Sequence, residues 1–119
     1  MSIVNLSNSN HEYLIGFLFK GMMNLTNAPE LKTTTSIARC YSNMFDHCKS
    51  LIKPPSVVYV NSSKAGCNGM FYNCKKITYA PELPATTLAN GCYQWMFGAC
   101  SSLTSAPELP ATTLADGCY

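Results

Sequence analysis

The chain has 119 residues and a mass of 13.0 kDa, the length of one domain, and 47% of its residues are hydrophobic, enough to form a core. Only 12% are charged, and eight basic against six acidic side chains leave a formal net charge of +2. So small an excess predicts neither nucleic-acid binding nor attraction to an anionic membrane. Several lysines cluster in the middle of the chain without interleaved aromatic residues, which indicates a solvated face. They are Lys49, Lys53, Lys64, Lys75 and Lys76.

The first apolar segment, Tyr13–Phe19, is far shorter than the ~20 residues that a membrane-spanning helix needs. His11 and Glu12 precede it where a signal peptide has basic residues, and no small-residue cleavage site follows. We therefore predict neither membrane insertion nor an export signal in the chain as given. We interpret the segment as part of a degenerate first coil, and we expect residues 1–24 to form an N-terminal repeat or cap.

A repeat organises the rest of the chain. Ala80–Tyr93 recurs as Ala106–Tyr119 with a single difference, Asn90 against Asp116, at an offset of 106 − 80 = 26 residues. A fixed period of roughly 20–50 residues with apolar positions in register is typical of solenoids, whose units contact mainly their neighbours. We predict that residues 25–119 form three full 26-residue repeats and a partial fourth. The offset aligns Leu25, Leu51, Ile77 and Leu103, and we expect these four residues in one buried row. It also aligns Pro29, Pro55, Pro81 and Pro107.

Each repeat is expected to contain one short strand and one short helix or helical turn. The proline in its fifth place limits the strand, because proline donates no hydrogen bond to a sheet. From Cys92 to Leu103 the apolar residues stand three or four apart, the spacing of a helix with one buried face. The predicted fold class is thus an α/β repeat, with short parallel strands ~4.8 Å apart on one face and short helices or helical turns on the other.

The pattern Met-Phe-x-x-Cys-x-x-Leu-Thr-x-Ala-Pro-Glu-Leu resembles the BspA-type leucine-rich repeats of bacterial surface proteins. The matching residues are Met44, Phe45, Cys48 and Leu51, then Met70, Phe71, Cys74 and Ile77, then Met96, Phe97, Cys100 and Leu103. The resemblance covers about Leu18 to Tyr119. It implies a leucine-rich-repeat-like right-handed solenoid, displayed on a bacterial cell or secreted, that adheres to host proteins or cells and has no catalytic residues.

The chain departs from that family in two ways. We expect no signal or lipoprotein anchor, which is usual in the family, in the chain as given. The second full repeat replaces its Leu-Pro-Ala-Thr-Thr-Leu-Ala block with residues from Val57 to Lys64, and its cysteine moves one place to Cys67. We expect a different loop there and an unchanged Met-Phe-Cys column after it.

Six of the seven cysteines fall on two columns of the repeat, and Cys67 lies one residue away from a column. One column is Cys48, Cys74 and Cys100, and the other is Cys40, Cys92 and Cys118. No Cys-x-x-Cys pair occurs, and the spacings match no familiar zinc site. Free cysteine behaves as a small buried hydrophobe, so we favour reduced ladders in the core. Disulfides between coils, which need Cα atoms within ~4.4–6.8 Å, and metal binding are the alternatives.

We predict no enzymatic activity, catalytic residue, metal site or cofactor. His47 and Cys48 are sequence neighbours, and neighbours on a helix point in different directions, so they do not form a nucleophile–base pair. The glutamates of the repeat share one column, which a serine interrupts, and too few oxygens converge there for calcium. This column is Glu30, Ser56, Glu82 and Glu108. No glycine-rich phosphate loop occurs.

The third place of the repeat varies while its neighbours stay constant, as a solvent-facing column does. It holds Asn27, Lys53, Tyr79 and Ser105. With Glu30, Glu82 and Glu108, these are the candidate residues for binding a protein or glycan, and an ordinary solvated face without a ligand is the alternative. Trp95 is expected to be partly exposed, as a packing residue of the convex side or, alternatively, as a binding anchor.

Two functions from different classes remain open. The leading hypothesis is a binding or adhesion module on a bacterial cell surface or secreted. The other is a structural component of a phage virion, such as a tail or capsid decoration protein, assembled in the cytoplasm without export. A piece of a longer surface protein is a third interpretation, because Tyr119 falls in the middle of a coil without a polar cap. Self-association or a continued array is then expected at that end.

Overall fold

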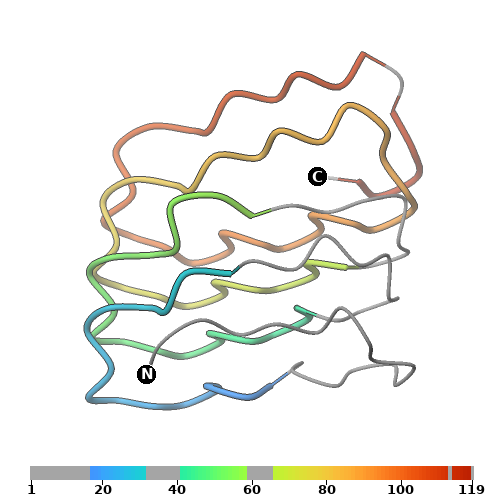
Figure 1. Cartoon of the computed structure of the whole chain (residues 1–119). Helices are drawn as coiled ribbons and strands as arrows, with labels where there is room; N and C mark the ends of the chain where they lie inside the picture. The colour runs from blue at the N-terminus through green and yellow to red at the C-terminus, as the bar shows by residue number, and fades with distance from the viewer. Residues whose placement is uncertain (1–16, 32–40, 59–65, 113, 119) are drawn as a thin grey trace.

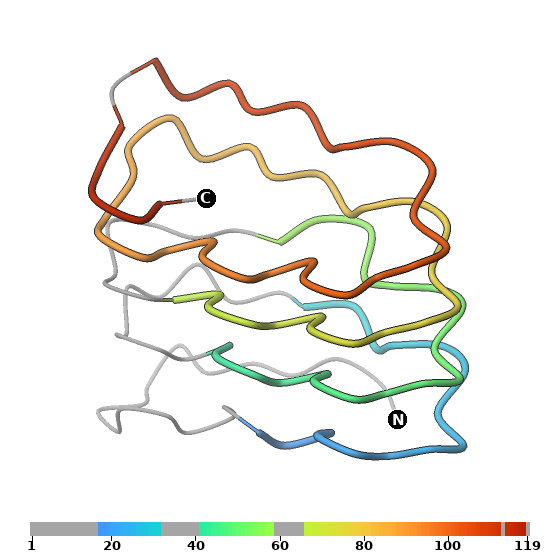
Figure 2. The ribbon, with the colours of Figure 1, turned by 180° about the vertical axis from the view of Figure 1, so that it is seen from behind.

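Two walls of backbone lie opposite each other in the structure, a computed structural model that describes residues 17–31, 41–58, 66–112 and 114–118. The chain runs along one wall and returns along the other, and successive passes lie side by side (Figures 1 and 2). The four coils occupy residues 17–31, 41–58, 66–84 and 90–110, and residues 114–118 start another pass. We call the wall of residues 17–22, 41–48, 66–74, 90–100 and 114–118 the turn face. We call the wall of residues 25–31, 51–58, 77–84 and 103–110 the bridge face.

No helix or extended strand occurs among these described residues. The β-bridges with both partners described are isolated parallel pairs, Asn27 with Lys53 and Val57 with Glu82. Prolines at Pro29, Pro54 and Pro55 prevent longer pairing, because a proline nitrogen has no hydrogen to donate.

The turn face contains a series of type II turns. In each of them the N–H of the fourth residue donates to the carbonyl oxygen of the first, and the third residue has a positive φ. For example, Met44 N–H donates to the Tyr41 carbonyl (3.2 Å) around Asn43, whose φ is 56°. The turns between them, such as the one closed by Asp46 N–H and the Asn43 carbonyl (3.2 Å), have a third residue without a positive φ. The third residues of the described type II turns are Gly21, Asn43, His47, Gly69, Asn73, Gly91, Trp95, Ala99 and Gly117.

The other N–H groups of the turn face bond to the next coil. Asn43 N–H donates to the Asn68 carbonyl (2.9 Å) and Phe45 N–H to the Met70 carbonyl (2.9 Å). From Asn43 to Cys48, N–H groups therefore alternate between an acceptor in their own turn and one in the next coil. Because an unpaired buried N–H costs free energy, this alternation lets the wall pack without strands or helices.

The short helix or helical turn predicted from Cys92 to Leu103 is a run of turns with left-handed residues instead. Positive φ values at Trp95 (60°) and Ala99 (57°) are incompatible with a right-handed helix. Turns that recur every four residues put Met96 and Cys100 on the same inner side as a helix would. The apolar spacing therefore identified the buried side correctly and the backbone wrongly.

A stack of phenylalanine rings lies between the walls. Phe19, Phe45, Phe71 and Phe97 follow one another with ring centroids 5.3, 5.4 and 5.6 Å apart and interplanar angles of 2–4°. Phe19 and Phe45 are 26 residues apart, so the interval of the repeat extends to the first described coil. The predicted division of the chain at residue 24 stays a prediction, because it rests partly on residues outside the described ranges.

The aligned leucine row is fully buried at its centre. Leu51 and Ile77 are 0% exposed, whereas Leu25 and Leu103, on the outer coils, are half-buried. An inner coil is covered by a neighbour on each side, and the fourth coil has fewer described residues beyond it. The position in the stack thus decides how deeply the same residue type is buried.

The second coil slips by one residue on the bridge face. Val57 pairs with Glu82, 25 residues ahead, so Val58 takes the buried position that corresponds to Leu83, and both are at most 4% exposed. The register returns on the turn face, where Cys67 N–H donates to the Cys92 carbonyl (2.8 Å). This bond places Cys67 in the column of Tyr41 and Tyr93, where it is fully buried.

The cysteines of one column bond to the coil before them. The Cys48, Cys74 and Cys100 thiols donate to the Phe19, Phe45 and Phe71 carbonyl oxygens at 2.9, 3.1 and 3.1 Å. All six described cysteines are free thiols. Five of them are buried and Cys100 is partly exposed. Cys40 lies outside the described residues. Burial raises the pKa of four thiols above the ordinary 9.0: Cys48, Cys74, Cys92 and Cys100.

Replacing Phe71→Ala should lower the free energy of unfolding by about 3–5 kcal/mol, because it removes a fully buried ring from the middle of the stack. The matched control is Tyr79→Ala, a side chain 45% exposed, which should change stability by about 0.5 kcal/mol or less. Urea unfolding followed by circular dichroism measures both. Equal losses would contradict the continuous stack.

Stability should fall as the pH rises above about 9. Unfolded thiols release their protons near pH 9, whereas the raised pKa keeps the folded thiols protonated, so the stabilisation present below that pH is lost above it. The urea midpoint at about pH 8 and at about pH 10 tests this. Because lysines and tyrosines titrate in the same range, Cys74→Ala is the control, and it should make the decline shallower. An identical decline would contradict the burial of that thiol.

Candidate functional site

The first half of the predicted binding column is a bridged pair. Lys53 N–H donates to the Thr26 carbonyl (3.1 Å), and Ala28 N–H donates to the Lys53 carbonyl (2.9 Å), which pairs Asn27 with Lys53. Laterally paired residues of a parallel bridge have side chains on the same side. Asn27 and Lys53 are both exposed, so they present neighbouring polar groups to solvent.

The second half of the column lies on the third and fourth coils. Tyr79 is 45% exposed, and Ser105 is exposed. Their coils are joined next to them, where the Thr104 N–H and hydroxyl both donate to the Thr78 carbonyl, at 3.2 and 3.0 Å. Between residues 51–53 and 77–79, both described, no backbone hydrogen bond joins the coils. The structure therefore brings the four residues onto one face as two pairs.

In the glutamate column, one carboxylate accepts hydrogen bonds and the other two have no described partner. The Glu30 carboxylate accepts hydrogen bonds from the Ser56 N–H (3.1 and 3.2 Å) and hydroxyl (3.0 Å). The serine that interrupts the column is thus the partner of its first glutamate. Glu82 and Glu108 are exposed, and in the described part of the chain neither carboxylate has a hydrogen-bond or ion-pair partner.

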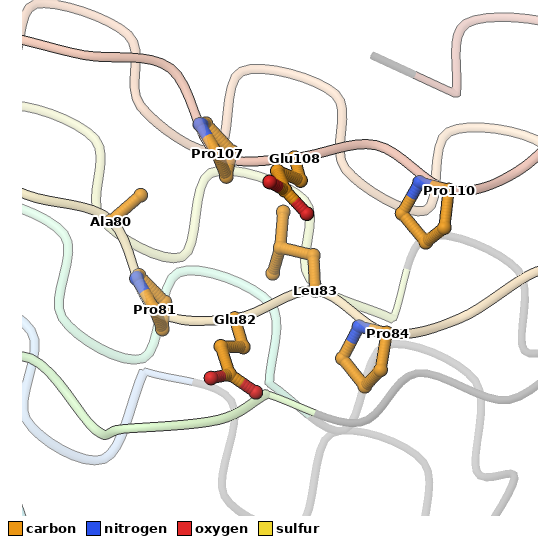
Figure 3. A pocket seen from close by; sticks show the side chains of 8 residues that line it. All are labelled: Ala80, Pro81, Glu82, Leu83, Pro84, Pro107, Glu108 and Pro110. Atoms are coloured by element: carbon orange, nitrogen blue, oxygen red, sulfur yellow. The ribbon is translucent and has the colours of Figure 1, made fainter.

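Glu82 and Glu108 line a hollow of about 490 Å³ with four prolines (Figure 3). The prolines are Pro81, Pro84, Pro107 and Pro110. Their rings fix the local backbone, so a partner orders little chain on binding. Figure 3 shows both carboxylates directed the same way from neighbouring coils, without converging on one point. This arrangement suits two basic groups on an extended partner better than a single chelated cation.

A different polar cluster lies on the turn face around Asp46. Its carboxylate accepts hydrogen bonds from Lys20 Nζ (3.2 Å) and Asn43 Nδ2 (3.1 Å), and it contacts His47 Nδ1 at 2.5 Å. Asp46 is 4% exposed, and a buried carboxylate is stable only when it is paired and hydrogen-bonded. The His47 side chain is 43% exposed, so Asp46 holds a solvent-accessible imidazole in one orientation.

His47 and Cys48 make contacts in separate directions. The Cys48 thiol bonds to the Phe19 carbonyl in the core, while His47 bonds to Asp46 on the outside. These two sets of bonds leave no hydrogen bond between the imidazole and the thiol.

Next to this cluster is a second hollow, of about 350 Å³. Asn43, Asp46, His47 and Asn68 line it with polar groups, and Tyr72 and Trp95 add aromatic surface. Gly69 forms part of its lining, with a φ of 60°, and a Cβ atom there would lie 2.8 Å from Asn43 Nδ2. The hollow therefore depends on the missing side chain of Gly69.

The sequence interpretation missed this hollow, although a usable signal was present. The outer turn-face columns vary as much as the binding column does: Asn43, Gly69 and Trp95 in one, and Asp46, Tyr72 and Gly98 in another. The expected helix concealed this variation, because it assigned these positions to a packed convex side. Trp95, expected to be partly exposed, is 64% exposed.

In the described ranges, no group of three or more His, Cys, Asp or Glu residues could hold a metal ion. No helix of those ranges is long and apolar enough to cross a membrane. Comparison of the chain with protein-family models, curated proteins and solved structures finds no match.

Proposed function

We propose that the chain is a non-enzymatic binding or adhesion module that presents its bridge face to a protein or glycan partner. The observation that carries this proposal is the placement of Asn27, Lys53 and Tyr79 as exposed, chemically different side chains on one repeating wall. Regular scaffolds with variable exposed columns form the extended binding surfaces of solenoid proteins.

The proposed fold is a right-handed, leucine-rich-repeat-like solenoid. It is supported by side-chain and backbone contacts at a separation of 26 residues, such as Ser42 to Asn68 and Asn68 to Gln94. The ring stack repeats at the same interval. With the resemblance to BspA-type repeats, this supports a location on a bacterial surface or outside the cell.

The free carboxylates of Glu82 and Glu108 favour a protein partner with basic side chains over a neutral one. Tyr79 adds an exposed ring on the same wall, and tyrosine is common in binding surfaces because it combines apolar area with a hydroxyl. A basic, extended segment of a partner protein has the matching chemistry.

Replacing Lys53→Ser together with Tyr79→Ser should leave folding intact and weaken binding at least about tenfold, a loss of about 1.4 kcal/mol. An array of extracellular-matrix proteins and glycans identifies the partner, and titration calorimetry then compares the variants. The matched control is Lys49→Ser with Phe17→Ser, an exposed charged and aromatic pair on other positions. A collapse of the melting temperature in the first variant, or unchanged affinity, would contradict the proposal.

A structural role in a larger assembly, such as a phage virion, is the second candidate, and an exposed leucine of the fourth coil favours it. Leu83 and Leu109 stand in identical sequences, yet Leu83 is 4% exposed and Leu109 is 44% exposed. A second subunit packed against the fourth coil would cover this leucine.

This second candidate predicts self-association through the fourth coil. Sedimentation velocity should detect concentration-dependent assembly, and Leu109→Glu with Leu114→Glu should abolish it, because two exposed apolar side chains (44% and 64%) become charged. Tyr79→Glu, on an exposed site of the bridge face, should leave it unchanged. A monomer at every concentration would exclude the structural role and leave the binding module in place.

A further inference from the structure

We propose a second binding site, on the turn face, that takes a neutral saccharide between Trp95, Tyr72 and His47. The site is the hollow of about 350 Å³ described above, near the lower end of the volumes usual for small-ligand sites. It goes beyond the proposed function, because it uses the other wall of the molecule and other residues.

Folding does not account for Trp95. It occupies the third place of a type II turn with a φ of 60°, a conformation that glycine and asparagine adopt readily and bulky residues avoid. The two residues of its column on the preceding coils are Asn43 and Gly69. Trp95 is also 64% exposed, so burial does not compensate for the strain. Strained, exposed aromatic residues are characteristic of sites that contact a ligand.

The polar side of the hollow is held in a fixed orientation. Both Asp46 oxygens are occupied, Oδ1 by His47 and Oδ2 by Asn43 and Lys20, so Asp46 positions its neighbours and does not itself bind. Because His47 Nδ1 faces Asp46, Nε2 is the ring nitrogen left for a ligand hydroxyl. A preoriented donor or acceptor loses less entropy on binding than a mobile one.

Charge and shape indicate the ligand class. Asp46, the one carboxylate among the described residues that line the hollow, is neutralised by Lys20 at 3.2 Å, so this described lining offers no free charge to an ion, a phosphate or a basic peptide. Tyr72 lies with its ring centroid 6.1 Å from that of His47 and adds a second aromatic surface. Sugars combine apolar C–H faces, which pack on aromatic rings, with hydroxyl edges, which pair with imidazole and amide groups. A neutral sugar therefore fits both parts of the lining.

Two glycines make the surface concave. A Cβ atom at Gly69 would collide with the Asn43 side chain, and one at Gly98 would lie 2.6 Å from the Tyr72 ring. Larger residues at either position would displace the groups that line the hollow. The concavity thus depends on the same columns that vary among the coils.

Trp95 is the only tryptophan of the chain, so its fluorescence reports directly on the site. We expect a saturable change in emission with methyl α-mannoside, methyl β-galactoside or chitotriose, with a Kd in the millimolar range or below. His47→Ala and Tyr72→Ser should weaken the preferred sugar at least about tenfold while the urea midpoint shows a folded protein. The Lys53→Ser, Tyr79→Ser variant should bind the sugar as the unchanged chain does.

Trp95→Gly separates a binding role from a packing role. Glycine is favoured at this φ, so the variant should be at least as stable as the unchanged chain, whereas calorimetry should find sugar binding lost. A marked loss of stability would show that Trp95 packs the wall, and it would overturn the proposal. No saturable response to any of the sugars up to roughly 50 mM would overturn it as well. Sugar binding abolished by the Lys53, Tyr79 change but kept in Trp95→Gly would move the ligand to the bridge face, supporting the proposed function and refuting this site.

Discussion

The alternating hydrogen bonds of the turn face are the constraint on which the rest of the structure depends. Each N–H from Asn43 to Cys48 has an acceptor, either three residues back or in the next coil. Each such bond contributes only about 0.5–1.5 kcal/mol net, but an unmade one in a buried wall costs more. The coils are therefore held to one register, and the phenylalanine rings and the cysteine thiols repeat because the backbone does.

Backbone hydrogen bonds and buried side chains stabilise the fold in separate ways, and the exposed side chains contribute little to either. The ladder uses backbone groups, and the core uses the residues that face inward, such as Phe45, Met70 and Ile77, all 0% exposed. Most outward side chains take no part in this ladder, so they differ from coil to coil. Each candidate binding surface includes such positions, one surface on each wall.

The sequence predicted which inner columns are buried, because the 26-residue period aligns their apolar residues. It could not predict the backbone between them, because four-residue turns and helices place apolar residues at the same spacing. The changed residues from Val57 onward predict a different loop, but the slip that buries Val58 instead of Val57 depends on local pairing with Glu82, which the repeat does not specify. The Asp46 cluster joins Lys20 to Asn43 and His47 across two coils, and only the stacking of the coils brings these residues together.

The positive-φ positions show where the residue type is least suited to the backbone conformation. In the second and third coils these positions hold Asn43, His47, Gly69 and Asn73, residue types that tolerate this conformation. In the first and fourth coils they include Phe17, Trp95 and Ala99, which do not. Selection for folding alone would favour glycine or asparagine at these positions. A bound ligand would account for the aromatic residue at Trp95.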